Sequence, residues 1–174
     1  MKALVLLLSI MSTVFQIDFS QKDVEGWAII NDRVMGGQSN GRIAATEEGV
    51  LFFGNVSLEN NGGFTSYRSS FQQYSLEDTR TLKIRYRSDE MCMALQLDIY
   101  KRFYYPYFKV SLPISAEWTE LEIPISEIEQ YRMGDPTGSK LTKETLGRII
   151  RMGLVTDEKR AGDFKLEVDY IIFE

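Results

Sequence analysis

The stretch that decides the fold is TLKIRYRSDEMCMALQLDIY, residues 81–100. In residues 82–87 Leu, Ile and Tyr alternate with Lys and Arg, and in residues 93–99 Met, Leu, Leu and Ile alternate with small or polar residues. Successive side chains of a β-strand point to opposite faces, so a period of two indicates a strand with one buried face. The stretch therefore predicts two half-buried strands.

The same alternation returns in residues 120–123 and 164–170. The sequence predicts further strands at Gln16–Phe19, Trp27–Asn31, Arg42–Thr46, Val50–Ser57, Phe64–Ser69, Tyr104–Leu112 and Ile150–Thr156, with a tight hairpin at Glu47–Gly49. Helix is scarce: Thr142 is placed to cap one or two turns, and Ser126–Ile128 is a second short turn. Many strands with little helix predict an all-β sandwich in a single domain.

The amino-acid composition excludes several classes of catalytic site. The 174 residues carry a net charge of -5, which gives no general attraction for nucleic acid. There is no histidine and one cysteine, Cys92, so a Ser-His-Asp triad, a Cys-His pair and a disulfide within the chain are excluded. The sequence predicts no catalytic, cofactor or metal residues; a site of paired carboxylates such as Asp98 and Glu122 is the least favoured alternative. We predict a protein that is not an enzyme.

The N-terminus begins with Lys2 and an apolar run to Phe15. This pattern has the length of a signal peptide and is short for a membrane span; the alternative is a buried first strand. We predict a leader at residues 1–15, a single domain at residues 16–174, and no stable membrane span once the leader is removed. The protein is then an exported monomer, periplasmic or extracellular; without a leader it is cytoplasmic.

One predicted strand face combines charges with tyrosines. If the middle strands are neighbours, alternation places seven polar or aromatic residues opposite the Leu and Ile core, namely Arg85, Arg87, Gln96, Asp98, Tyr100, Tyr105 and Tyr107. One interpretation is a solvated face with cross-strand ion pairs. The other is a binding face, because tyrosine supplies a flat apolar surface with a polar tip.

Two clusters rich in Asn and Gly interrupt the strands, NDRVMGGQSNG at residues 31–41 and ENNGGF at residues 59–64. Asn and Gly tolerate a positive φ, which suits sharp turns. No helix is predicted to follow either cluster, as a phosphate-binding loop would require. We predict a structural role for the cluster residues Asn31, Asp32, Met35, Gly36, Gly37, Ser39, Asn60, Asn61, Gly62, Gly63 and Phe64.

These clusters also carry a resemblance. Trp27, NDRVMGGQSNG and FFGNVSLENNGGFTSYR, followed by EWTELEIPISEI and RMGLVTDEKRAGDFKLEVDYI, closely resemble the complex I intermediate-associated protein 30 family. The similarity runs from about residue 17 to near the end of the chain. It implies a galactose-binding-domain-like jelly-roll sandwich, in agreement with the strand pattern. It also implies a relation to assembly factors of NADH:ubiquinone oxidoreductase.

Two functions follow. The first is a non-enzymatic, chaperone-like assembly factor that acts through contacts with a protein partner, as the resemblance implies. The alternative is an exported carbohydrate-binding module, favoured by the predicted leader, the jelly roll and the tyrosines.

Overall fold

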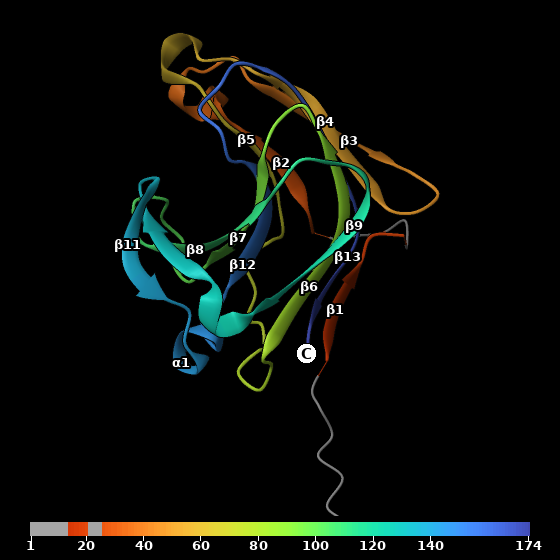
Figure 1. The fold of residues 1–174 in the computed structure, drawn as a ribbon. Coiled ribbons are helices and arrows are strands. Elements are labelled where there is room, and N and C mark those ends of the chain that lie inside the picture. The colour runs from red at the N-terminus through yellow and green to blue at the C-terminus, as the bar shows by residue number, and fades with distance from the viewer. Residues whose placement is uncertain (1–13, 21–25) are drawn as a thin grey trace, which may run out of the picture.

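The computed structural model describes residues 14–20 and 26–174. In this part of the chain two antiparallel sheets pack face to face (Figure 1). The strands are β1 (Phe15–Asp18), β2 (Ala28–Asn31), β3 (Asn40–Ala45), β4 (Val50–Val56), β5 (Thr65–Arg68), β6 (Thr81–Asp89), β7 (Met93–Asp98), β8 (Tyr107–Leu112), β9 (Ser115–Pro124), β10 (Glu129–Arg132), β11 (Asp135–Lys140), β12 (Arg151–Thr156) and β13 (Gly162–Phe173). The helical turns are η1 (Asp32–Met35), η2 (Glu59–Asn61), η3 (Ile125–Glu127) and α1 (Lys143–Leu146).

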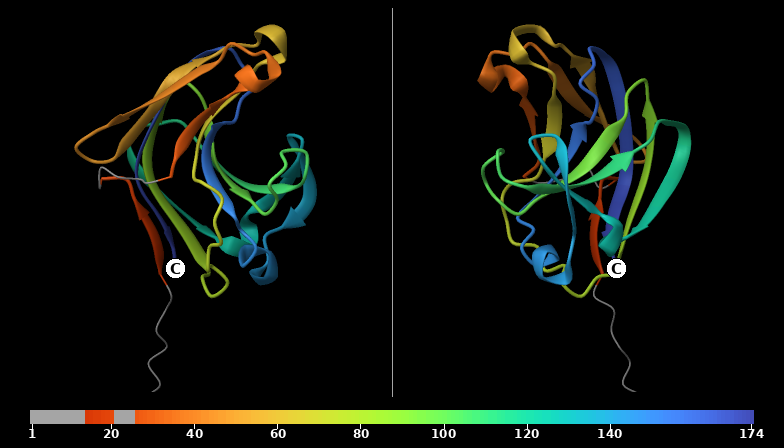
Figure 2. Two further views of the ribbon diagram at one scale, coloured as in Figure 1. Left: turned by 180° about the vertical axis from the view of Figure 1, so that it is seen from behind. Right: turned by 60° about the vertical axis from the view of Figure 1, so that its left-hand side comes forward.

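One sheet has six strands, in the order β3-β4-β13-β6-β9, with β1 also paired to β13. The long strand β13 pairs with β4 along its first half and with β1 near its end. The other sheet has seven strands, in the order β11-β10-β8-β7-β12-β5-β2. Figure 2 shows the two layers from behind and from the side. The predicted all-β jelly-roll sandwich with short helices is confirmed.

The core lies between the layers and follows the predicted alternation. Leu82 and Ile84 of β6 and Leu95 and Leu97 of β7 are fully buried. Burying each such side chain contributes about 1.5–3 kcal/mol relative to leaving it exposed. Yet β6 and β7, consecutive in the chain, belong to different sheets. The turn between them, in which Glu90 has a φ of 71°, carries the chain across the sandwich.

Most predicted elements appear within a residue or two of the expected bounds. Thr142 caps α1: its hydroxyl accepts a hydrogen bond from the Thr145 amide, and the Thr145 hydroxyl accepts one from the Thr142 amide. The β3–β4 hairpin closes through Thr46 and Gly49. The hairpin of β10 and β11 was not predicted.

The N-terminal part of the predicted leader, residues 1–13, lies outside the described residues. Phe15, its last residue, opens β1 opposite Phe173, and its ring lies edge-on to Tyr74 at 5.4 Å between centroids. Across the described ranges, no helix combines the length and the apolar character needed to cross a membrane.

Candidate ligand-binding face

The outer face of the seven-stranded sheet carries a row of polar and aromatic side chains. The register places Asp98 of β7 between Arg151 of β12 and Tyr107 of β8. In the adjacent row, Gly153 of β12 lies between Arg68 of β5 and Gln96 of β7. We call these five side chains, Arg68, Gln96, Asp98, Tyr107 and Arg151, the polar face.

Arg68 is the centre of the polar face. Its Nη1 lies 3.0 Å from Asp98 Oδ2, its Nη2 lies 3.4 Å from Gln96 Oε1, and its Nε donates to the Ser66 hydroxyl at 2.9 Å. Gln96 in turn donates to Asp98 Oδ1 at 2.7 Å. The Arg68 and Asp98 side chains are only 17% and 13% exposed, so this ion pair is largely shielded from solvent.

Gly153 makes this arrangement possible. A Cβ atom at position 153 would lie 2.7 Å from Cγ of Arg68, closer than non-bonded carbon atoms approach one another. Because glycine has no side chain, the Arg68 stem crosses β12 and its guanidinium reaches β7.

Arg151 lies beside this network. Its Nε donates to the Ser69 carbonyl oxygen at 2.8 Å, and its guanidinium lies 4.5 Å from the centre of the Phe71 ring. Burial lowers the pKa of Arg151 below its ordinary value, and the neighbouring positive charge of Arg68 lowers it further. The polar face thus carries two positive charges, on Arg68 and Arg151, and one negative charge, on Asp98.

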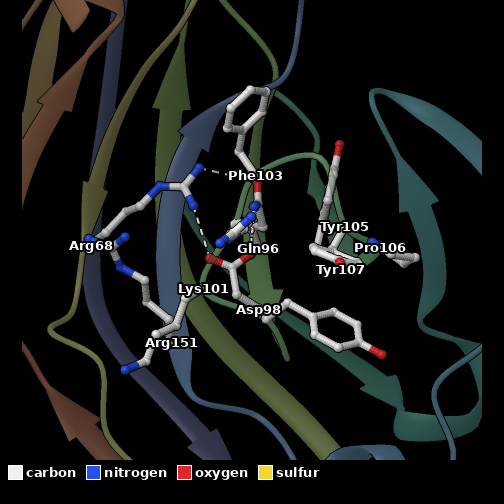
Figure 3. A pocket seen from close by; sticks show the side chains of 11 residues that line it. Arg68, Gln96, Asp98, Lys101, Phe103, Tyr105, Pro106, Tyr107 and Arg151 are labelled. Carbon is white, nitrogen blue, oxygen red and sulfur yellow. Dashed lines mark hydrogen bonds and ion pairs between the residues drawn. The ribbon is translucent and has the colours of Figure 1, made fainter.

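The connection between β7 and β8 forms the wall of a pocket of about 80 Å³ above the polar face. The wall residues are Tyr100, Lys101, Arg102, Phe103, Tyr105 and Pro106. Figure 3 shows Asp98 and Gln96 between the two arginines on one side and Tyr105 and Pro106 on the other. The Tyr105 ring packs at 4.9 Å against both Tyr100 and Tyr104, while Phe103 is 72% exposed.

A pair of stacked tyrosines extends the polar face. The rings of Tyr107 and Tyr131 of β10 are nearly parallel, at 20° and 6.3 Å between centroids. Lys109 Nζ lies 4.0 Å from the Tyr131 ring centre and 2.7 Å from Asp157 Oδ1. Burial raises the pKa of the Tyr107 hydroxyl above its ordinary value.

Five of the seven predicted face residues come together here: Gln96, Asp98, Tyr100, Tyr105 and Tyr107. The placement of Arg85 and Arg87 with them was wrong, because β6 lies in the six-stranded sheet. There Arg85 pairs with Asp169 and Arg87 with Glu167, and their guanidinium carbons lie 4.4 and 5.0 Å from the Trp118 ring centre.

Sequence reasoning missed Arg68, Tyr131 and Arg151. Arg68 and Arg151 both lie in strands that were predicted, but no face was assigned to the residues of those two strands. The sequence pattern does not contain the order of the strands within each sheet, which is what brings Arg68 and Arg151 next to Gln96 and Asp98. Tyr131 belongs to the hairpin that was not predicted, so no signal identified it.

The two glycine clusters meet at Asp32, a carboxylate with no exposed surface. Asp32 Oδ2 accepts hydrogen bonds from the Ser39 hydroxyl at 2.5 Å, the Gly63 amide at 2.8 Å and the Phe64 amide at 3.3 Å. Its Oδ1 accepts from the Ser39 amide at 3.0 Å. Burial by itself raises the pKa of Asp32, but these hydrogen bonds outweigh it and hold the pKa below 3.8.

The neighbouring Asn31 joins the clusters a second time. Its Oδ1 accepts hydrogen bonds from the Gly41 amide at 3.0 Å and the Thr65 hydroxyl at 2.5 Å. Two adjacent side chains at the end of β2 thus hold together loops about thirty residues apart in the chain.

The backbone of the clusters departs from one expectation. Glycine in these clusters suits turns with a positive φ, yet the φ of Gly62 is -67°. Positive φ falls instead on Gly36 (89°), Asn60 (54°), Asn61 (61°) and Gly63 (137°). A Cβ atom at Gly62 would lie 2.7 Å from Asp32 Oδ2. The role of Gly62 is therefore to leave space for the Asp32 carboxylate, and its backbone is not in a left-handed conformation.

Several solved structures with the same fold are carbohydrate-binding modules. The family 11 module of the cellulosomal cellulase Lic26A-Cel5E of Clostridium thermocellum is 13% identical, with a TM-score of 0.65 over 92% of this chain and 94% of that one. A family 11 module from Clostridium thermocellum in complex with a β-1,3-1,4-mixed-linked tetrasaccharide is 14% identical, with a TM-score of 0.62 over 92% of this chain and 94% of that one.

A third similar structure is the agarase AgWH50C, 14% identical, with a TM-score of 0.59 over 92% of this chain and 24% of that one. At these identities the likeness establishes the fold alone. Among curated proteins no match was found. The family described as Complex I intermediate-associated protein 30 (CIA30) matches residues 17–168, which include both glycine clusters and nearly every strand. The chain therefore belongs to the complex I intermediate-associated protein 30 family.

Proposed function

We propose that this protein is a non-catalytic saccharide-binding domain whose ligand lies along the outer face of the seven-stranded sheet. The observation that carries the proposal is the placement of the stacked Tyr107 and Tyr131 rings beside the Arg68, Asp98 and Gln96 network. A sugar ring presents an apolar C–H face and a rim of hydroxyl groups. Aromatic rings suit the first, and fixed donors and acceptors suit the second.

The geometry favours a chain over a single sugar. The pocket of about 80 Å³ is small for a whole ligand, since enclosed ligand sites usually measure about 300–1,000 Å³. The tyrosine pair lies beside the network in neighbouring strands rather than beneath it. An oligosaccharide lying across β12, β7, β8 and β10 would contact both features. The relation to carbohydrate-binding modules supports this proposal through the fold.

We expect Tyr107→Ala and Tyr131→Ala each to weaken oligosaccharide binding by about tenfold or more, because truncating a central aromatic contact commonly costs over about 1.4 kcal/mol. Isothermal titration calorimetry with mixed-linked glucan, agarose and galactan oligosaccharides measures this loss. Trp118→Ala is the matched control, since it removes a larger ring from the outer face of the other sheet. If both tyrosine variants bind the oligosaccharide as tightly as the parent protein and melt at the same temperature, the proposal is contradicted.

The second candidate function is a protein-binding, assembly-factor-like role, which the family description suggests. The observation that favours it is the exposure of Phe103 (72%) and Met133 (61%), on loops joined where Arg132 Nε donates to the Tyr104 carbonyl oxygen. Exposed apolar side chains of this size are common at protein contacts. A folded protein that binds none of the saccharides would make this the preferred function.

The predicted leader at residues 1–15 bears on both candidates. Export would bring the domain to the polysaccharides of the cell surface or its surroundings, and it would separate the protein from cytoplasmic assembly steps. We propose an exported protein.

A further inference from the structure

The pocket above the polar face is strongly cationic, although the whole chain carries a net charge of -5. Its lining includes the basic side chains of Arg68, Lys101, Arg102 and Arg151 and a single acidic one, Asp98. Charges of one sign that are concentrated in a shallow site attract ligands of the opposite charge.

Arg68 and Asp98 compensate each other through their ion pair. The other three cations have no such partner: within residues 14–20 and 26–174, no carboxylate forms an ion pair with Lys101, Arg102 or Arg151. These cations contact aromatic rings and neutral oxygens instead. Lys101 Nζ lies 5.8 Å from the Phe71 ring centre, and Arg102 Nη1 donates to the Tyr104 hydroxyl at 2.6 Å.

Arg151 is the cation best placed to receive a ligand. It is partly buried, it stands in the strand next to Asp98, and its Nε is already fixed by the Ser69 carbonyl oxygen. The Nε bond and the Phe71 ring hold the guanidinium plane in place, so little conformational entropy is lost when an anion binds its remaining N–H groups. Burial and the nearby charge of Arg68 disfavour the positive charge on Arg151, the Asp98 carboxylate offsets them in part, and a bound anion would offset them further.

We propose that the saccharide recognised here is acidic, bearing carboxylate or sulfate groups, and that one such group binds between Arg151 and Lys101 while the sugar rings extend over Tyr107 and Tyr131. This inference rests on the proposed saccharide-binding function and names its ligand class. A planar guanidinium binds a carboxylate or sulfate through parallel N–H bonds, which a neutral hydroxyl cannot match in strength.

The test is calorimetric titration of the full chain with pairs of oligosaccharides in which one member carries the acidic groups and the other has them esterified or removed. One pair is an oligogalacturonate and its methyl ester; the other is a sulfated galactan oligosaccharide and its desulfated form. We expect at least one acidic member to bind about tenfold or more tightly than its neutral counterpart, and to lose affinity at high salt as charges are screened. The two pairs distinguish carboxylate from sulfate recognition.

Arg151→Gln should reduce that preference by about tenfold, the usual scale of one charge-assisted contact. Lys101→Gln, at an exposed loop position, supplies a second variant should Arg151→Gln fail to fold. Arg42→Gln is the matched control, because it removes the same charge from an exposed position in the six-stranded sheet.

Neutral and acidic members that bind equally would overturn the charge preference and leave the saccharide function standing. Binding of no member of either pair, together with none of the neutral saccharides above, would overturn both proposals. Charge preference that survives in both the Arg151 and Lys101 variants would overturn the assignment of the anion to these residues.

Discussion

Asp32→Asn is expected to lower the free energy of unfolding by about 3 kcal/mol or more. Asp32 is fully buried and accepts four hydrogen bonds from donors in the two glycine clusters. An asparagine keeps one acceptor oxygen but turns an NH₂ group toward an N–H or O–H donor, and each buried donor left without a partner costs about 1–3 kcal/mol. Urea denaturation measures the change, with Asp135→Asn, at an exposed position of β11, as the control.

The pH dependence of stability provides a second readout of the same change. Because the pKa of Asp32 is lower in the folded protein than in the unfolded chain, its contribution is fully present above the unfolded-state value of about 3.9. That contribution is lost as the pH falls through the lower, folded-state pKa. Asp32→Asn should lack this component of acid sensitivity. An unchanged urea midpoint and an unchanged acid profile would show that Asp32 does not stabilise the clusters.

Gly37→Ala is expected to cost about 2 kcal/mol or more, for a reason other than backbone strain. The Cβ atom would overlap the Asp32 carboxyl group, so either the carboxylate or the loop must move and hydrogen bonds are lost. Overpacking of a closed site commonly costs about 1–3 kcal/mol. Thermal or urea unfolding of the single variant measures this cost.

A double-mutant cycle separates the overlap between the new Cβ atom and the Asp32 carboxyl group from any other effect of Gly37→Ala. In an Asp32→Ala background the Gly37→Ala cost should nearly vanish, because the overlapping atoms are gone. Gly62→Ala is the contrasting case: its Cβ would also lie 2.7 Å from the Ser57 carbonyl oxygen, so much of its cost should remain. Additive costs for Asp32→Ala and Gly37→Ala would contradict the assigned role of Gly37.

Alternation identified the buried face of β6 and of β7, but it could not assign strands to sheets. Residues 82–87 and 93–99 show the same period of two, and both contribute fully buried leucines to one core. The outward residues Arg85 and Asp98 nevertheless lie on opposite sides of the sandwich, because the chain crosses between the layers at Glu90. That crossing depends on pairing between distant segments, such as β6 with β9 and β7 with β12, which a local pattern does not record.

The missed hairpin has a different cause. Every residue of β11 is exposed, so the strand has no buried face to produce alternation. Its turn uses Met133 and Gly134 at φ values of 53° and 94°, and methionine is not a residue that predicts a left-handed turn. Because this hairpin was not predicted, Tyr131, which stacks on Tyr107, was not identified either. The joining role of Asp32 was likewise invisible, because it depends on amides about thirty residues further along the chain.

The most direct test of the central claim is to map saccharide binding by NMR, following backbone amide chemical shifts while an oligosaccharide is added to the labelled protein. We expect shifts concentrated in β5, β7, β8, β10 and β12 and in the loop at residues 99–106, with Gly153, Gln96 and Asp98 among the amides affected. We expect little change in β3, β4, β6 and β9, which belong to the other layer. Shifts centred on the six-stranded sheet or on the Asp32 clusters, or no shifts with any saccharide, would contradict the claim.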